Sequence, residues 1–259
     1  MGGAERGQAK RKQQAAQGVT AARGNGRPSR GVVAAVAIIV ALAMVAGLGL
    51  WLQNRNSPAD LPAAIPVAAA GPEYPVVLQG DTVVAGRAQA PVTIDIYEDF
   101  LCPGCAEFEK LYHQQLAQAA ADGMARVVYH PVAILDDHSE PAGYSTLAAG
   151  AAFCAAQVGI FPQFHNSLFA TQPAEDGPGW TSAQLHQLAR DLGAGDGFAG
   201  CMQAGTDRRV AASTQIARLF VSGLRTDGRF GTPSVVVNGT LIDIGDPGWL
   251  DQALSRAQR

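Results

Sequence analysis

The stretch YEDFLCPGCAEFEK, residues 97–110, places Cys102 and Cys105 three residues apart between two segments of different periodicity. The segment before it, PVTIDIY, alternates apolar and polar residues, which predicts a strand with one buried face. The segment after it carries apolar residues at helical spacing to about residue 121, which predicts an amphipathic helix. The two cysteines therefore lie where a strand leads into a helix, on one helix face and within disulfide reach.

The start of a helix favours an ionised sulfur. The backbone N–H groups of the first turn have no helical acceptor and point toward the first sulfur, which lowers the pKa of a cysteine placed there. Pro103 is tolerated at this position because its missing N–H has no helical partner. We therefore expect Cys102 to be the exposed, attacking thiolate and Cys105, one turn inward, to be the resolving thiol.

A C-x-x-C pair has two other readings. Half of a zinc site is one, but the next cysteine is Cys154 and the five histidines form no H-x₃₋₅-H pattern, so no metal site is predicted. A purely structural crosslink is the other, but so short a loop constrains the unfolded chain little. The spacing favours a pair that opens and closes.

The rest of the domain, residues 76–259, alternates strand and helix patterns. Residues 125–135 predict a second strand, parallel to the first through a right-handed crossover. Helical periodicity then dominates to about residue 222, and residues 232–244 predict a hairpin turning at Asn238-Gly239, before a final helix. The expected fold class is α/β: a small mixed sheet with helices inserted at about 139–222.

This order, with EDFLCPGC at the helix start and GTP at 231–233, resembles the thioredoxin superfamily, in its membrane-anchored DsbA-like branch. The resemblance implies that Pro233 follows a cis bond and packs against Cys102. It also implies that the backbone of Thr232 binds an extended substrate peptide. The chemistry it implies is thiol–disulfide exchange, with the redox-active disulfide as the only cofactor.

One position departs from that resemblance. Related folds often carry a buried acid six residues before the first cysteine, where this chain has Ile96. Asp95 faces the other side of the strand by alternation. Glu98 and Asp99 are the acids nearer the pair, and the sequence does not choose between them for proton transfer at Cys105.

The remaining cysteines, Cys154 and Cys201, both lie in the inserted helices. An even cysteine count in an exported domain favours a structural disulfide between them. The alternative is two separate buried thiols.

The first 75 residues indicate a membrane anchor. Residues 1–30 carry seven basic residues and one acid, whereas the whole chain has a net charge of −3. Residues 31–52 contain no charge and would form roughly 33 Å of helix, enough to cross a bilayer. Residues 53–75, with five prolines, predict an extended tether. A basic arm before such a segment predicts a cytoplasmic N-terminus and a catalytic domain outside.

The basic arm and the apolar segment each have one alternative explanation. The arm could bind nucleic acid, but a topology signal explains it more simply. A cleaved signal peptide is less favoured because the apolar run exceeds the roughly 7–15 residues of such a core. The expected protein is therefore an extracytoplasmic, single-pass enzyme without nucleic-acid partners.

The expected activity is disulfide formation in exported cysteine-containing proteins. A quinone-linked membrane partner of the DsbB or vitamin K epoxide reductase type would restore the disulfide. A reductase or isomerase of the same fold, and a non-enzymatic chaperone or adaptor, are the alternatives. Because Pro-Gly replaces the Pro-His of the strong oxidants between the cysteines, we expect a weaker oxidant than those.

Overall fold

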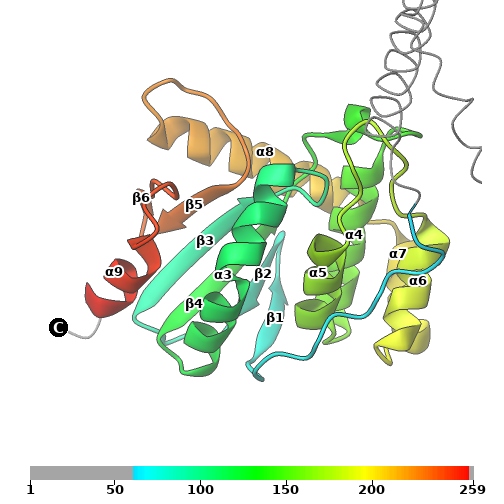
Figure 1. The fold of residues 1–259 in the computed structure, drawn as a ribbon, viewed down its shortest axis with the longest axis horizontal. Helices are drawn as coiled ribbons and strands as arrows, with labels where there is room; N and C mark the ends of the chain where they lie inside the picture. Colours follow the sequence, from blue (N-terminus) through cyan, green and yellow to red (C-terminus); the bar gives the residue numbers. More distant parts are fainter. Residues whose placement is uncertain (1–60, 257–259) are drawn as a thin grey trace, which may run out of the picture. The chain divides into compact units, whose positions relative to one another are not determined.

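The computed structural model describes residues 61–256, which are built around one six-stranded sheet (Figure 1). The strand order is β1-β2-β4-β3-β5-β6, in which β3 and β4 are parallel and every other neighbouring pair is antiparallel. The strands are β1 (Val76–Gln79), β2 (Thr82–Ala85), β3 (Val92–Glu98), β4 (Ala125–Pro131), β5 (Ser234–Val237) and β6 (Thr240–Leu241).

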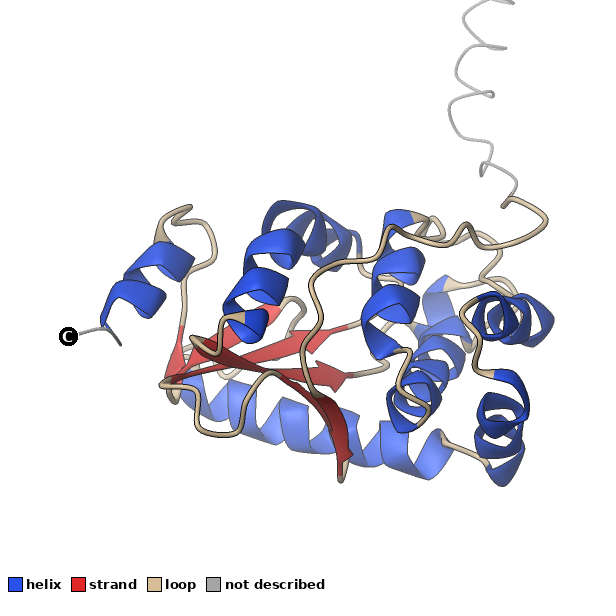
Figure 2. Cartoon of the chain, turned by 90° about the horizontal axis from the view of Figure 1, so that it is seen from below, coloured by secondary structure: helices blue, strands red, loops and turns tan. Residues whose placement is uncertain are grey.

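Helices cover both faces of this sheet (Figure 2). Helices α3 and α9 lie on one face, and α8 lies on the opposite face. The helices are α3 (Pro103–Ala121), η2 (Asp136–His138, a 3₁₀ turn), α4 (Tyr144–Gln157), α5 (Phe161–Ala170), α6 (Ser182–Asp191), α7 (Gly195–Ala204), α8 (Asp207–Leu224) and α9 (Trp249–Arg256).

Strand β3 is central and carries the sequence pattern that predicted it. Val92, Ile94 and Ile96 are fully buried on one face. Ile96 pairs with Tyr129 of β4 on one side and with Val235 of β5 on the other. The chain leaves the carboxyl end of this strand directly into α3, so the cysteine pair lies at the carboxyl end of the central strand.

The expected α/β fold, a small mixed sheet with inserted helices, is therefore confirmed, with two corrections to the elements. The first hairpin, β1–β2, was not predicted, because each strand has only four residues and one face is partly exposed. The strand predicted over 125–135 ends at Pro131.

The insertion is narrower than the predicted 139–222. Helix α8 packs on the sheet, with Ala217 and Val221 buried in a cluster with Tyr97, Val132 and Val236. Helices α4 to α7 therefore form the insertion proper, and α8 covers the second face of the sheet.

The end of the predicted tether is part of the domain. Residues 61–75 are extended, but Ile65 is buried in the core. The backbone N–H of Ala68 donates to Ser167 Oγ at 2.9 Å, and Gln184 Nε2 donates to the carbonyl oxygen of Pro62 at 3.2 Å. These contacts fix the segment along the inserted helices.

The predicted arm at 1–30 and membrane segment at 31–52 lie outside the described residues. Within residues 61–256, no helix is both long enough and apolar enough to span a bilayer.

Candidate active site

Cys102 is the N-cap residue of α3, and Cys105 lies in its first turn. The carbonyl oxygen of Cys102 accepts hydrogen bonds from the backbone N–H groups of Cys105 at 3.0 Å and Ala106 at 3.2 Å. Pro103 occupies the first helical position, as its missing N–H permits. Gln172 Nε2 also donates to the Cys102 carbonyl oxygen, at 2.9 Å, and so ties the insertion to the helix start.

Asp99 holds the turn between β3 and α3. Its carboxylate is fully buried and accepts hydrogen bonds from Leu101 N, Ser145 Oγ, Ile134 N and Leu135 N at 2.7–3.1 Å. Burial raises the pKa of Asp99, and these hydrogen bonds act in the opposite direction. Glu98 and Asp99 were the two acids that the sequence left open for proton transfer at Cys105. The carboxylate of Asp99 is thus occupied by the hydrogen bonds that hold the turn.

The environment of Cys102 favours the thiolate. A hydrogen bond from the Cys105 thiol, together with the backbone N–H groups of Gly104 and Cys105, lowers the pKa of Cys102 from 9.0 to about 6. Partial burial opposes the shift without cancelling it. A pKa of about 6 favours the thiolate of Cys102 at neutral pH, with the Cys105 hydrogen bond as the largest cause and the N–H groups of the helix start as smaller ones.

The environment of Cys105 favours the thiol. Its side chain is fully buried, and this burial raises its pKa well above the ordinary value. The neighbouring Cys102 and Glu98 raise it further. The two sulfurs thus differ in ionisation although they lie in the same helical turn, and only Cys102 is accessible.

Thr232 and Pro233 lie directly against this pair. Sγ of Cys102 lies 3.3 Å from the carbonyl oxygen of Thr232, a contact in which the protonated thiol donates. The Thr232–Pro233 peptide bond is cis. A Cβ placed on Gly104 would lie 3.1 Å from Pro233 Cδ and 3.7 Å from Cys102 Sγ, so the backbone at Gly104 approaches both closely. The structure therefore brings together all four residues that the sequence assigned to the redox site.

Residues 78–254 match the protein family described as Thioredoxin. The chain belongs to the thioredoxin family.

Relatives with solved structures specify the branch. The domain superposes on the oxidised DsbA of Mycobacterium tuberculosis with a TM-score of 0.55 and 29% identity, covering 71% of this chain and 92% of that one. It superposes on the reduced disulfide bond oxidoreductase DsbG of the same organism with a TM-score of 0.53 and 28% identity, covering 70% and 95%. This thioredoxin-family domain thus has the fold of the DsbA-like thiol–disulfide oxidoreductases.

A curated relative is longer. The serine/threonine-protein kinase PknE of Mycobacterium tuberculosis is 33% identical over 177 residues, which is 66% of this chain. The match spans only 31% of the kinase's length. The kinase name belongs to that longer protein.

Cys154 and Cys201 are joined by a disulfide that links α4 to α7. Their Cα atoms are 5.6 Å apart, and Cys154 is fully buried. This bond lies within the insertion of the thioredoxin-family domain, where the sequence placed it.

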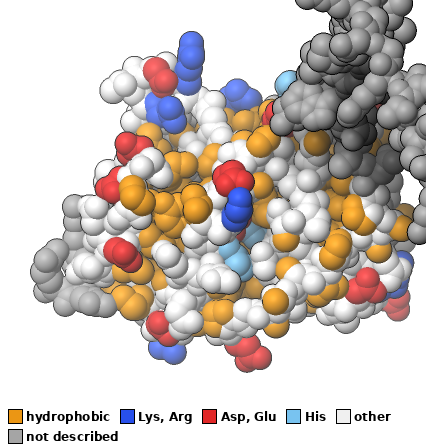
Figure 3. Space-filling model, viewed as in Figure 1, with side chains coloured by type: hydrophobic (Ala, Val, Ile, Leu, Met, Phe, Trp, Pro, Cys, Tyr) orange, Lys and Arg blue, Asp and Glu red, His pale blue; other side chains and the backbone are white. Residues whose placement is uncertain are grey.

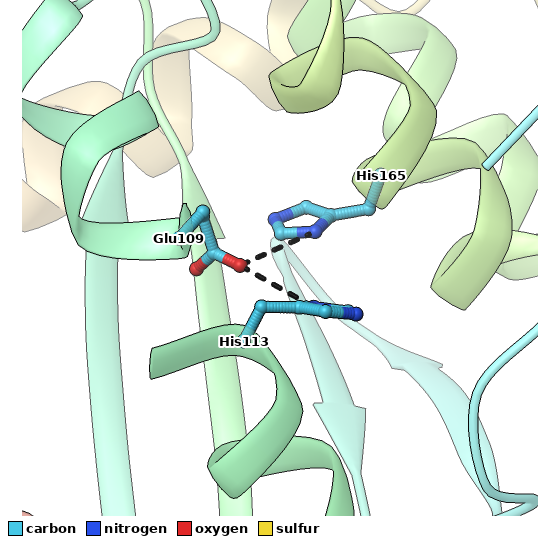
Figure 4. Close-up of side chains that lie close together, drawn as sticks. All are labelled: Glu109, His113 and His165. Atoms are coloured by element: carbon cyan, nitrogen blue, oxygen red, sulfur yellow. Dashed lines mark ion pairs between the residues drawn. The ribbon is translucent and has the colours of Figure 1, made fainter. Parts of the chain in front are cut away.

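A second group of polar residues lies beneath the pair and was not predicted as a site. Glu98 is fully buried, and its Oε1 is 2.6 Å from Nε2 of His165 on α5. Burial raises the pKa of Glu98 well above its usual range and lowers the pKa of His165 to about 4, so His165 is neutral at physiological pH. Glu109 and His113 of α3 lie on the other side of the His165 ring (Figure 4).

Sequence reasoning missed this group for a clear reason. His165 was treated as a structural residue, and the Glu109–His113 spacing of four residues was the only local signal. The group forms only when α5 packs against α3.

Proposed function

We propose that this chain is an extracytoplasmic thiol–disulfide oxidoreductase that forms disulfides in exported proteins. The observation that carries the proposal is the difference between two sulfurs in one helical turn. Cys102 has its pKa lowered to about 6, and Cys105 is buried with its pKa raised. Such a pair has one sulfur for intermolecular exchange and one for intramolecular resolution.

In the oxidising direction, a substrate thiolate attacks Sγ of Cys102 in the closed pair. The Cys102–Cys105 bond breaks, a mixed disulfide forms, and Cys105 leaves with the electron pair and takes up a proton. A second thiolate of the substrate then attacks the substrate sulfur that is bonded to Cys102. The substrate disulfide forms, and Cys102 leaves as a thiolate. The substrate has lost two electrons, and the pair has gained them.

The same atoms support the reverse direction, in which the Cys102 thiolate attacks a substrate disulfide and Cys105 resolves the intermediate. The lowered pKa of Cys102 favours oxidation, because a stabilised thiolate stabilises the reduced pair and makes the closed pair a better oxidant. Gly104 adds no charge beside that thiolate, which supports a weaker oxidant than a Pro-His enzyme.

Substrate binding is assigned to the backbone before β5. Thr232 and Pro233 are partly exposed beside Cys102. An extended peptide placed there would pair with this backbone as an added strand, which brings a substrate cysteine to the attacking sulfur without requiring a particular sequence.

The extracytoplasmic location is part of the proposal. The Cys154–Cys201 disulfide supports an oxidising compartment. The charge difference between residues 1–30 and the rest of the chain supports anchoring with the N-terminus in the cytoplasm. A quinone-linked membrane protein would then reoxidise the pair.

Oxidative refolding of a reduced, scrambled substrate tests the activity. The oxidised wild-type chain should restore the substrate's native disulfides, and Cys102→Ser should remove this activity. Cys105→Ser should accumulate a mixed disulfide at Cys102, which mass spectrometry detects. Equal refolding by the wild type and Cys102→Ser would instead identify a non-enzymatic chaperone and would overturn the proposal.

A further inference from the structure

Three potential metal ligands converge between α3 and α5 (Figure 4). Glu109 and His113 are four residues apart on α3 and share one face, and His165 approaches from α5. Glu109 Oε2 lies 3.6 Å from His113 Nδ1 and 3.9 Å from His165 Nδ1. One ligand atom from each residue lies within 4.8 Å of the other two.

These atoms face one another without bonding. Glu109 is 3% exposed, yet neither of its carboxylate oxygens has a hydrogen-bond partner among the described residues. Nδ1 of His113 is also buried without one. Buried polar atoms are normally paired, so an unpartnered buried carboxylate calls for a ligand.

The distances fit a shared ion better than direct hydrogen bonds. Separations of 3.6 and 3.9 Å are too long for a hydrogen bond between nitrogen and oxygen. Two ligands of a tetrahedral zinc ion, each about 2.0–2.2 Å from the metal, lie roughly 3.3–3.5 Å apart. A shift of a few tenths of an ångström would bring Glu109 Oε2 to that spacing from each of the two imidazole nitrogens.

Glu98 supplies the support that histidine ligands commonly have. Glu98 Oε1 lies 2.6 Å from His165 Nε2, while Nδ1 of the same ring faces Glu109. A metal ion on Nδ1 would leave the ring proton on Nε2, from which it would donate to Glu98. A carboxylate behind a ligating histidine fixes the tautomer and the ring orientation in this way.

The cluster borders the molecular surface. Glu109 and His113 line a surface cavity of about 640 Å³ together with Asn166 and Gln172. Figure 3 shows imidazole at the surface on the face that carries α3, beside an adjoining acidic and basic side chain. The ligand atoms themselves are buried behind this wall, so an ion would reach them through side-chain movement at the cavity.

We propose that Glu109, His113 and His165 bind a divalent transition-metal ion of the Zn²⁺ class, with Glu98 as the positioning residue behind His165. Two imidazoles and a carboxylate are ligands that such ions accept, and three protein ligands leave a fourth position for water. The ion would join the helix that carries the cysteine pair to the inserted helices. The proposed ligands do not include Cys102 or Cys105, so the metal site can be tested independently of thiol exchange.

The test uses the full chain with its cysteine pair oxidised, because a free dithiol would itself bind zinc. After treatment with a chelator and dialysis, the protein is titrated with Zn²⁺ in a calorimeter. We expect one ion per chain, and binding at least about tenfold weaker in Glu109→Gln and in His113→Asn. Glu98→Gln should weaken binding about 10–100-fold.

Two matched controls define the outcome. Glu107→Gln removes a carboxylate from the wall of the same cavity, and His138→Asn removes an exposed imidazole far along the chain; both should bind Zn²⁺ as the wild type does. No binding to the wild type would overturn the site. Equal binding by Glu109→Gln and the wild type, or a loss in Glu107→Gln alone, would overturn the assigned ligands.

Two further measurements exclude misfolding and sulfur ligation. Without metal, Glu109→Gln should unfold at the wild-type temperature or above, because it removes an unpartnered buried carboxylate. With Zn²⁺, only the wild type and the two control variants should unfold at a higher temperature. Co²⁺ should give the visible absorption of a tetrahedral site, and a thiolate-to-cobalt charge-transfer band would contradict the ligand set.

Discussion

The sulfur of Cys102 lies 3.3 Å from the carbonyl oxygen of Thr232, although the two residues are 130 positions apart. The contact follows from the sheet. Strand β5 pairs with β3, with Ser234 opposite Tyr97, so the segment before β5 and the segment after β3 meet at one end of the two strands. The nucleophile and the backbone assigned to the substrate are thus placed by the same strand pairing.

The ionisation of Cys102 predicts its reactivity with pH. Because its pKa is about 6, the alkylation rate of the reduced protein by iodoacetamide should be half-maximal near pH 6. Cys105 should stay unmodified in the folded protein, since it is buried and its pKa is raised. Mass spectrometry of quenched samples measures both rates, and half-maximal alkylation of Cys102 near pH 9 would contradict the lowered pKa of Cys102.

The same shift predicts a pH dependence of stability. The folded pKa of Cys102 is below the ordinary value of 9.0, so its stabilising contribution is complete above that value and is lost as pH falls toward about 6. Chemical unfolding of the reduced wild type and Cys102→Ser should therefore show a stability difference that grows between pH 6 and pH 9. A difference that does not change over this range would contradict the shift.

Gly104 provides a test of how charge sets the redox balance. A side chain at this position would start 3.7 Å from Cys102 Sγ, so the imidazole of Gly104→His would lie beside the thiolate. Its partial positive charge should stabilise the thiolate and make the pair more oxidising. Gly104→Asn controls for the 3.1 Å contact with Pro233 Cδ, which any side chain must relieve. Equal potentials for the two variants would show that charge has no part in the effect.

Replacing Asp99 should cause a large loss of stability. In Asp99→Asn, an amide replaces one of two oxygens that together accept four hydrogen bonds in a fully buried site. The replaced oxygen leaves two buried donors unpaired, and at about 1–3 kcal/mol for each the variant should lose roughly 2–6 kcal/mol of unfolding free energy. The exposed Asp137→Asn should change it by less than about 0.5 kcal/mol. Similar losses in both variants would refute the bracing role of Asp99.

The Cys154–Cys201 disulfide predicts a separate stability effect. The bond closes a loop with a sequence separation of 47, worth about 4 kcal/mol in the chain-entropy model. Cys154→Ala with Cys201→Ala should lower the unfolding free energy by about that amount and leave thiol exchange at Cys102 intact. Loss of exchange in a folded double variant would show that this bond also takes part in the chemistry.

Local patterns predicted the parts of the fold with the strongest periodicity. Helix α3 follows from its apolar spacing and Pro103, and the hairpin turn follows from Asn238 and Gly239, both of which have positive φ. The β1–β2 hairpin escaped because four-residue strands give little alternation to detect. The packing of residues 61–75 against the inserted helices was not predicted, because a proline-rich composition does not indicate which surface a segment contacts.

The site divides in the same way. Cys102 and Cys105 are recognisable from spacing alone, and Thr232 and Pro233 from a resemblance. The roles of Glu98 and Asp99 depend on which backbone and imidazole groups reach them, and those groups come from distant elements. Glu109, His113 and His165 form a cluster only through the contact of α3 with α5.

The most direct test of the account is a glutathione redox titration of the Cys102–Cys105 pair, read out by mass after trapping the thiols. We predict a reversible two-electron transition at a potential more negative than the roughly −120 mV of the strongest oxidants, with glutathione attached to Cys102 alone. A pair that stays in one state across the whole range of buffers, or glutathione attached to Cys105, would contradict the account.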